Sequence, residues 1–163
     1  MVVSAMLLAG TADAQELPKP AVEISAGWAG FVDESLVNHL VLGGAARVHL
    51  TPRLSIGPEL TYMIGPGEDH DIFLLGNVFF DFAWPRTSGA LRVSPFVVAG
   101  GGLFQHRSRF SRGAFTHNAL TFVGGGGLRV SVTDRLYVSP DVRIGLEDLH
   151  MRATVTVGVR LGR

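Results

Sequence analysis

Apolar and polar side chains alternate along most of this chain. Over residues 136–147 the even positions read Leu, Val, Pro, Val, Ile, Leu, and the odd positions read Tyr, Ser, Asp, Arg, Gly, Glu. Successive side chains of a β-strand point to opposite faces, so a period of two predicts a strand with one apolar and one polar face. The same pattern predicts eight strands, over residues 22–32, 38–50, 54–64, 72–83, 93–105, 117–132, 136–147 and 151–161.

Two segments of the chain resemble each other. Residues 43–60 read GGAARVHLTPRLSIGPEL, and residues 125–142, 82 positions later (125 − 43), read GGGLRVSVTDRLYVSPDV. Each contains a strand, a short turn at residues 51–53 or 133–135, and a second strand, which is the pattern of a β-hairpin. One period holds about four strands of roughly ten residues with their connections. The repeat therefore predicts an all-β, eight-stranded, antiparallel up-and-down barrel.

The polar faces of the predicted strands carry balanced charges. They collect five acids and five arginines: Glu23, Arg47, Glu59, Asp81, Arg129, Asp141, Arg143, Glu147, Arg152 and Arg160. A membrane barrel turns its apolar face to lipid and its polar face to the lumen, whereas a soluble barrel such as a lipocalin does the reverse. Lys occurs once, at Lys19, which is unusual for a water-facing surface. We therefore expect a transmembrane barrel; a soluble lipocalin-like binder is the alternative.

The ten charges also bear on whether the lumen is open. An eight-stranded barrel has an interior about wide enough to be filled by side chains. Unpaired charges are costly in such a space, and bidentate pairs between Arg and a carboxylate offset that cost. This predicts a closed polar lumen and a structural or surface-interaction role. A narrow pore or a conduit for small solutes is the alternative, because a continuous water path would permit one.

Composition limits the remaining classes. The 163 residues make one domain, with a mean hydropathy of +0.30 and 17% charged residues. No apolar run approaches the roughly 18 residues of a membrane helix. The formal net charge is zero, which gives no reason to expect a nucleic acid as partner. The absence of Cys excludes disulfides, thiolate metal sites and a cysteine nucleophile.

The first residues form a separate unit. Residues 2–10 are apolar, and Ala12-Asp13-Ala14 before Gln15 is a small-x-small cleavage pattern, so residues 1–14 are predicted to be a signal peptide. No Lys or Arg precedes Lys19, so we expect the charged front of this leader upstream of Met1. Residues 15–21 would form a periplasmic lead-in, and residues 22–163 the barrel.

Two features depart from a simple strand pattern. Pro58 and Pro140 lie within strands at equivalent places of the repeat, and Pro cannot donate a ladder hydrogen bond, so we predict bulges or bends there. The glycine runs at residues 100–102 and 124–127 lack the following helix of a phosphate-binding loop. We interpret them as sites of curvature and close strand contact.

Residues 43–60 and residues 96–104 (FVVAGGGLF) resemble the outer-membrane β-barrel domain family, the small OmpA-like and opacity-protein-like barrels of Gram-negative envelopes. The resemblance extends over roughly residues 22–163. It implies export to the cell outer membrane, contact with outer-membrane lipid and lipopolysaccharide, insertion by the outer-membrane machinery, and a monomer. The family includes adhesins and structural anchors, so the resemblance implies no particular ligand.

No catalytic residues and no cofactor are predicted. His117-Asn118-Ala119 resembles the His-x-Ser-Asn pattern of the outer-membrane lipid A deacylases, but Ala119 stands where the nucleophilic serine would be. We therefore predict that the protein is not an enzyme.

Two predicted loops carry candidate ligands. Residues 65–71 contain Glu68, Asp69, His70 and Asp71, whose oxygens could hold a hard cation weakly, although we interpret the segment as a solvated loop tip and predict no metal. The predicted loop at residues 106–115 holds Arg107, Arg109 and Arg112 around Phe110. Guanidinium groups bind phosphate in a bidentate manner, so we predict contact between these arginines and lipopolysaccharide; a basic loop without a fixed partner is the alternative.

Overall fold

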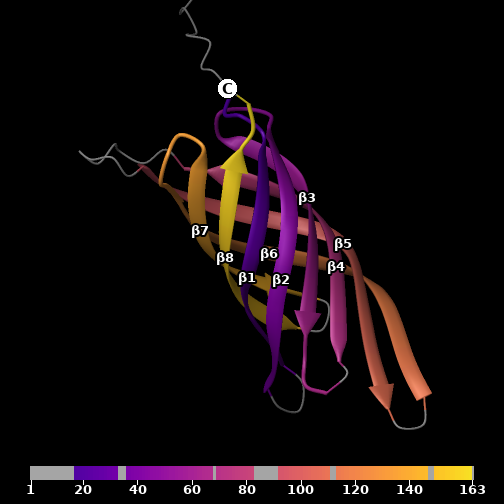
Figure 1. Ribbon diagram of the computed structural model, residues 1–163. Helices are drawn as coiled ribbons and strands as arrows, with labels where there is room; N and C mark the ends of the chain where they lie inside the picture. Colours follow the sequence, from indigo (N-terminus) through magenta and orange to yellow (C-terminus); the bar gives the residue numbers. More distant parts are fainter. Residues whose placement is uncertain are drawn as a thin grey trace, which may run out of the picture.

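The chain forms eight antiparallel strands that close into a barrel in this computed structural model (Figure 1). The strands are β1 (Ala21–Val32), β2 (Leu36–His49), β3 (Leu54–Ile64), β4 (His70–Asp81), β5 (Arg92–Phe110), β6 (Gly113–Ser131), β7 (Leu136–Gly145) and β8 (His150–Arg160). Each strand pairs with the next in sequence, and β8 closes the barrel against β1. The predicted fold class is confirmed.

The structure describes residues 17–32, 36–67, 69–82, 92–110, 113–146 and 149–162. Within these ranges, no helix is long and apolar enough to cross a membrane. The predicted signal peptide lies outside the described residues, and its cleavage stays a prediction. Residues 17–20 of the predicted lead-in precede β1 without regular structure. We call the end of the barrel where β1 begins and β8 ends the terminal end, and the opposite end the loop end.

Burial alternates along the strands as the sequence pattern predicts. In β4 every second side chain from Asp71 to Asp81 is buried, and those between them are exposed. The exposed face carries large apolar side chains, for example Ile24 (69% exposed), Leu120 (68%) and Leu146 (71%). Such a continuous apolar surface is unfavourable in water and suits lipid. The predicted orientation of the two faces, apolar outside and polar inside, is confirmed, and it contradicts the lipocalin-like alternative.

The two hairpin turns of the sequence repeat have the same hydrogen bonds. Thr51 Oγ1 accepts from the backbone N–H groups two and three residues later, at 3.2 and 2.9 Å. Thr133 Oγ1 accepts from the equivalent groups at 3.2 and 2.9 Å. The threonine side chain thus satisfies backbone donors that would otherwise be unpaired in the turn.

The structure corrects the prediction of bulges at the two prolines. A bulge inserts an extra residue on one strand. The pairs on either side of Pro140, between β6 and β7, are instead separated by two residues on both strands, and the same holds for Pro58 between β2 and β3. Two cross-strand pairs are interrupted at each proline, and the register is the same on either side. Opposite Pro140, the Leu128 carbonyl accepts from Ser139 Oγ at 3.1 Å in place of the missing backbone donor.

The structure also corrects the predicted loop at residues 106–115. β5 and β6 have 19 residues each and pair without a break from Arg92 and Ser131 to Phe110 and Gly113. Figure 1 shows this hairpin reaching past the neighbouring strands at the loop end. The polarity of residues 106–110 and 113–116 is typical of a loop, but both segments continue the β5–β6 ladder.

Candidate functional site

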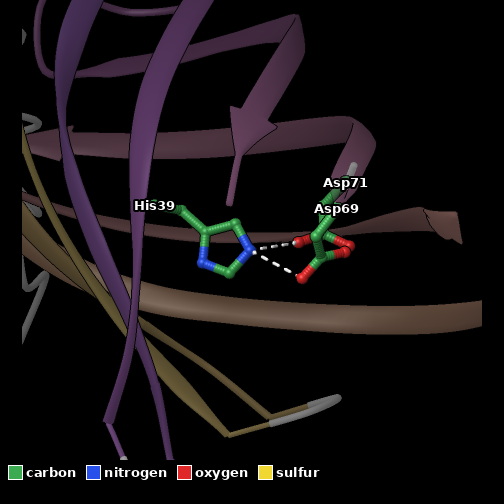
Figure 2. Close-up of side chains that lie close together, drawn as sticks. All are labelled: His39, Asp69 and Asp71. Carbon is green, nitrogen blue, oxygen red and sulfur yellow. Dashed lines mark ion pairs between the residues drawn. The ribbon is translucent and has the colours of Figure 1, made fainter. Parts of the chain in front are cut away.

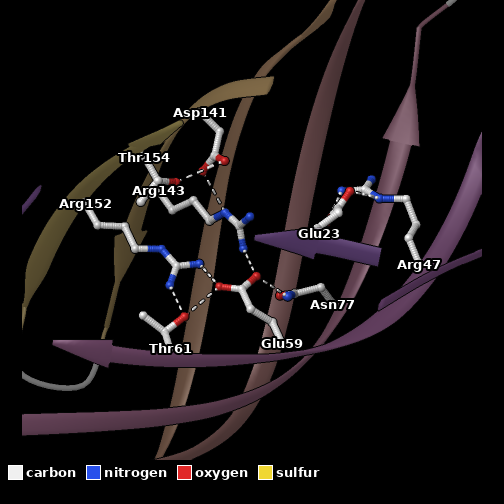
Figure 3. Close-up of polar contacts among 9 residues, drawn as sticks. All are labelled: Glu23, Arg47, Glu59, Thr61, Asn77, Asp141, Arg143, Arg152 and Thr154. Carbon is white, nitrogen blue, oxygen red and sulfur yellow. Dashed lines mark hydrogen bonds and ion pairs between the residues drawn. The ribbon is translucent and has the colours of Figure 1, made fainter. Parts of the chain in front are cut away.

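The largest polar cluster in the lumen is built around Glu59 of β3, which is 6% exposed (Figure 3). One carboxylate oxygen accepts from Arg143 Nη1 of β7 at 2.7 Å and from Asn77 Nδ2 of β4 at 2.8 Å. The other accepts from Thr61 Oγ1 at 2.9 Å and from Arg152 Nη2 of β8. β3 and β7 are four strands apart around the barrel (7 − 3 = 4), so this cluster crosses the lumen.

A second carboxylate completes the cluster. Arg143 Nε donates to Asp141 Oδ1 at 2.9 Å, and Thr154 Oγ1 donates to Asp141 Oδ2 at 3.2 Å. Arg152 Nη1 also donates to Thr61 Oγ1 at 3.0 Å. We call Glu59, Asp141, Arg143 and Arg152 the central ion network. Its two acids and two arginines balance, which is the condition under which buried charges are tolerated.

A further ion pair, between Glu23 and Arg47, lies between the central ion network and the terminal end. Glu23 of β1 accepts from Arg47 of β2 at 2.8 and 3.3 Å, in a bidentate pair. Tyr137 of β7 donates its hydroxyl to Glu23, and the Arg47 guanidinium lies 3.5 Å from the centre of the Phe79 ring. Tyr137 was not predicted as a site residue, although its place on the inward face of β7 could have indicated a lumen contact.

Of the remaining predicted lumen charges, two form an ion pair and one contacts neutral groups. Asp81 of β4 pairs with Arg129 of β6 across the β5 strand between them, and both are buried. Arg160 of β8 lies at the rim, where it donates to Ser131 Oγ at 2.9 Å and to the Asp134 carbonyl at 3.1 Å. Glu147 lies outside the described residues. Of the ten predicted lumen charges, the structure therefore brings eight into buried ion pairs and places Arg160 in neutral contacts.

The lumen has three layers along its axis. A cavity of about 940 Å³ opens at the terminal end and is lined by Arg47, Asp81, Arg129 and Tyr137, among others. The central ion network follows, and none of its members lines that cavity. Towards the loop end lies an apolar layer formed by Ala29, Phe31, Val41, Met63, Phe73, Leu75, Phe104 and Val123. The predicted wholly polar lumen was therefore incomplete, and a second apolar cluster, Phe79, Phe96 and Val98, lies on the inward face in the halves of β4 and β5 near the terminal end.

A titratable cluster borders the apolar layer near the loop end (Figure 2). His39 Nε2 of β2 lies 3.4 Å from Asp69 Oδ2 and 3.3 Å from Asp71 Oδ2. His106 Nδ1 of β5 lies 3.4 Å from Asp69 Oδ1 and 2.8 Å from Asp71 Oδ1. Asp69 and Asp71 come from the acidic segment that the sequence singled out, whereas the two histidines come from strands on either side of it.

The other members of that acidic segment do not join the cluster. His70 lies next to Tyr62, with ring centres 5.6 Å apart, and Glu68 is outside the described residues. His70 alternates with Asp71 along β4 and therefore belongs to the opposite face of the strand.

The predicted lipopolysaccharide-binding arginines lie on the extended hairpin. Arg107 of β5 is exposed and pairs in register with His70 and Thr116. Arg109 belongs to β5, but its side chain is outside the described part of the structure, as is Arg112. Phe115, on the facing strand, is 53% exposed, which gives the hairpin an aromatic as well as a basic surface.

Neither a protein-family model nor a curated protein sequence matches this chain. Solved structures do match it. Neisserial surface protein A is 12% identical with a TM-score of 0.75, and the match covers 87% of this chain and 97% of that one. The chain has the fold of the small outer-membrane barrels. Ail of Yersinia pestis, solved with the heparin analogue sucrose octasulfate, is 10% identical with a TM-score of 0.59, over 89% of this chain and 99% of Ail.

The fold is compatible with both catalytic and non-catalytic proteins. The outer-membrane enzyme PagL also matches, at 16% identity and a TM-score of 0.52, over 86% of this chain and 99% of PagL. In this barrel Asn118 accepts from Gln105 Nε2 at 2.9 Å, and Ala119 packs against the apolar layer. Ala119 offers no nucleophile, so the His117-Asn118-Ala119 segment has no means of forming an acyl intermediate at that position.

Proposed function

We propose that this protein is an outer-membrane barrel with a closed lumen that acts in envelope structure or surface interaction, and not as a conduit or an enzyme. The observation that carries the proposal is the central ion network, which joins β3 to β7 and β8 across the lumen. The apolar exterior and the fold shared with outer-membrane barrels support the location.

The layered lumen opposes the narrow-pore alternative. A water path would have to separate Glu59 from Arg143 and Arg152, which leaves the buried Arg152 without its ion-pair partner at a cost of about 3–5 kcal/mol. It would then have to cross the apolar layer, where Phe73 and Phe104 lie with ring centres 4.7 Å apart. Both barriers act in series, so opening one does not connect the two ends.

Conductance across planar lipid bilayers tests the closed lumen. We expect the inserted wild-type barrel to give no steady ion current above that of protein-free bilayers. An open barrel of known conductance, inserted by the same procedure, serves as the positive control. A reproducible single-channel current from the wild-type protein would establish the conduit alternative.

For surface interaction, we propose that the β5–β6 hairpin binds the phosphates of lipopolysaccharide through Arg107, Arg109 and Arg112. The exposed position of Arg107 and the projection of the hairpin support this proposal. Ail, a barrel of the same fold, was solved with a polysulfated sugar, which supports polyanion binding by this type of scaffold. The barrel would act as a monomer in contact with outer-membrane lipid, inserted by the outer-membrane machinery.

A triple replacement of these arginines by Ala tests the hairpin. We expect it to weaken binding of lipopolysaccharide by at least tenfold, because each lost phosphate pair removes a charge-assisted contact. The matched control replaces Arg53 and Arg135, which lie in turns at the terminal end, and should leave the affinity unchanged. Equal affinity in the hairpin variant and the wild type would rule out the proposed contact.

A further inference from the structure

We infer that His39, Asp69 and Asp71 form a binding site for a divalent transition-metal ion, of which Zn²⁺ is the representative, at the loop end of the lumen (Figure 2). This inference does not depend on the proposed envelope role. It rests on four features of the cluster: the spacing of the ligand atoms, the burial of His39, the contact at its other ring nitrogen, and the residues that support the carboxylates.

The spacing of the ligand atoms fits a small metal ion. One atom from each of the three residues lies within 4.8 Å of the others. His39 Nε2 is 3.3 and 3.4 Å from the nearest oxygens of Asp71 and Asp69. Bonds of about 2.0–2.1 Å around tetrahedral zinc place neighbouring ligand atoms about 3.4 Å apart. The imidazole and the carboxylates already have that separation.

The imidazole of His39 is buried and its Nε2 atom makes no hydrogen bond. The residue is 4% exposed, and Nε2 faces the two carboxylates (Figure 2). Its other ring nitrogen, Nδ1, lies 3.4 Å from the Val37 carbonyl. A backbone carbonyl at Nδ1 favours a proton there, which leaves the lone pair on Nε2 directed at Asp69 and Asp71. A lone pair facing two anionic oxygens is repulsive, and a cation between them removes the repulsion.

Electrostatics favour a divalent ion. Asp71 is 2% exposed, and the Phe31 ring lies 4.7 Å from that of His39. Two carboxylates lie beside an aromatic layer, where negative charge is poorly solvated, and buried anions require a cationic partner. A divalent ion between the two carboxylates supplies that partner.

Neighbouring groups hold the ligands in place. His106 Nδ1 contacts Asp71 Oδ1 at 2.8 Å, an arrangement typical of the hydrogen bonds that orient metal-binding carboxylates. Gly65 N–H donates to the Asp69 carbonyl at 2.9 Å and closes the β3–β4 loop over the site. A Cβ atom at Gly65 would overlap the His39 ring, so glycine is required there for the imidazole to lie in this position.

The ligand set indicates the class of metal. An imidazole nitrogen with carboxylate oxygens suits Zn²⁺, Co²⁺ and related ions, whereas Ca²⁺ and Mg²⁺ prefer oxygen ligands alone. Three protein ligands leave a fourth coordination position of a tetrahedral ion open. Asp69 and His106 are partly exposed, so the ion can enter from the loop end.

Cobalt binding to the refolded barrel tests this site. Untagged protein in detergent is freed of metal with a chelator and titrated with CoCl₂, while visible absorption is recorded. We expect one Co²⁺ per chain, with the d–d bands of a nitrogen- and oxygen-ligated ion, displaced by ZnCl₂ but not by CaCl₂. His39→Gln and Asp71→Asn should abolish the bands, and His106→Gln should weaken binding about 10–100-fold.

The control is His49→Gln, which removes a lumen histidine near the terminal end and should bind like the wild type. Folding of each variant is checked by its heat-modifiable migration. If the variants at His39 and Asp71 do not fold, Asp69→Asn in the loop is used in their place. Absence of a stoichiometric cobalt spectrum in the wild type, or an unchanged spectrum in folded His39→Gln or Asp69→Asn, would overturn the site and identify the cluster as imidazolium–carboxylate pairs.

Discussion

Replacement of Glu59 by Gln should destabilise the barrel more than any neutral substitution on its surface. Gln has the shape of Glu but no charge, and its amide group presents donors to a site built from donors. Arg143 would keep its pair with Asp141, at 2.9 Å, whereas Arg152 would lose the carboxylate with which it pairs. The perturbation therefore leaves one buried guanidinium without its ion-pair partner.

The structure sets the expected size of this effect. Glu59 and Arg152 are both almost fully buried, so solvent does not screen the loss. Removing one partner of a buried ion pair costs about 3–5 kcal/mol. We therefore expect Glu59→Gln to lower the free energy of unfolding by that amount. The double variant Glu59→Gln, Arg152→Met removes the orphaned charge as well and should recover at least half of the loss.

Urea-induced unfolding of the refolded barrel in lipid vesicles measures these differences from the midpoint and slope of each transition. Arg53→Gln, an exposed substitution in the β2–β3 turn, is the control and should change the free energy by less than about 0.5 kcal/mol. A loss below about 1 kcal/mol for Glu59→Gln, or a double variant no more stable than the single one, would refute the reasoning.

Three further predictions concern other parts of the barrel. Tyr137→Phe removes a hydrogen bond to the buried Glu23 carboxylate, which keeps its pair with Arg47, and should cost about 1–3 kcal/mol in the same assay; no change would mean that water replaces the hydroxyl. Thr133→Ala removes both side-chain hydrogen bonds of the β6–β7 turn and should cost about 1 kcal/mol, and Thr51→Ala should match it if the two turns are equivalent. Val142→Arg, on the exposed face midway along β7, should cost about 2–4 kcal/mol in vesicles, and a neutral effect would show that this face is not in lipid.

The sequence predicted most of the strands because each buries one face and exposes the other. The alternation from Leu136 to Gly145 needs no knowledge of the neighbouring strands, since it follows from the pleat of a single strand. The repeat added the two matching turns. The β5–β6 extension, residues 106–110 and 113–116, was missed because its polar residues are typical of a loop, whereas its cross-strand partners are set by the register of the two strands.

The site could be predicted only in part for the same reason. Charged inward positions such as Glu59 and Arg143 stand out in an apolar chain, but their pairing across the lumen depends on the closure of the barrel. Asp69 and Asp71 stand out as an acidic segment, whereas His39 is 30 residues away from Asp69 (69 − 39) and joins it only through the pairing of β2, β3 and β4. No local pattern carries that information.

The central claim is that this chain is a transmembrane barrel of the outer membrane. A gel of fractionated Gram-negative cells expressing the exported protein tests it directly, with detergent-extracted samples run before and after boiling. We predict a band in the outer-membrane fraction that changes its migration on boiling, because a closed barrel stays folded in the detergent at low temperature. A protein recovered in the soluble periplasmic fraction, with the same migration before and after boiling, would contradict the account.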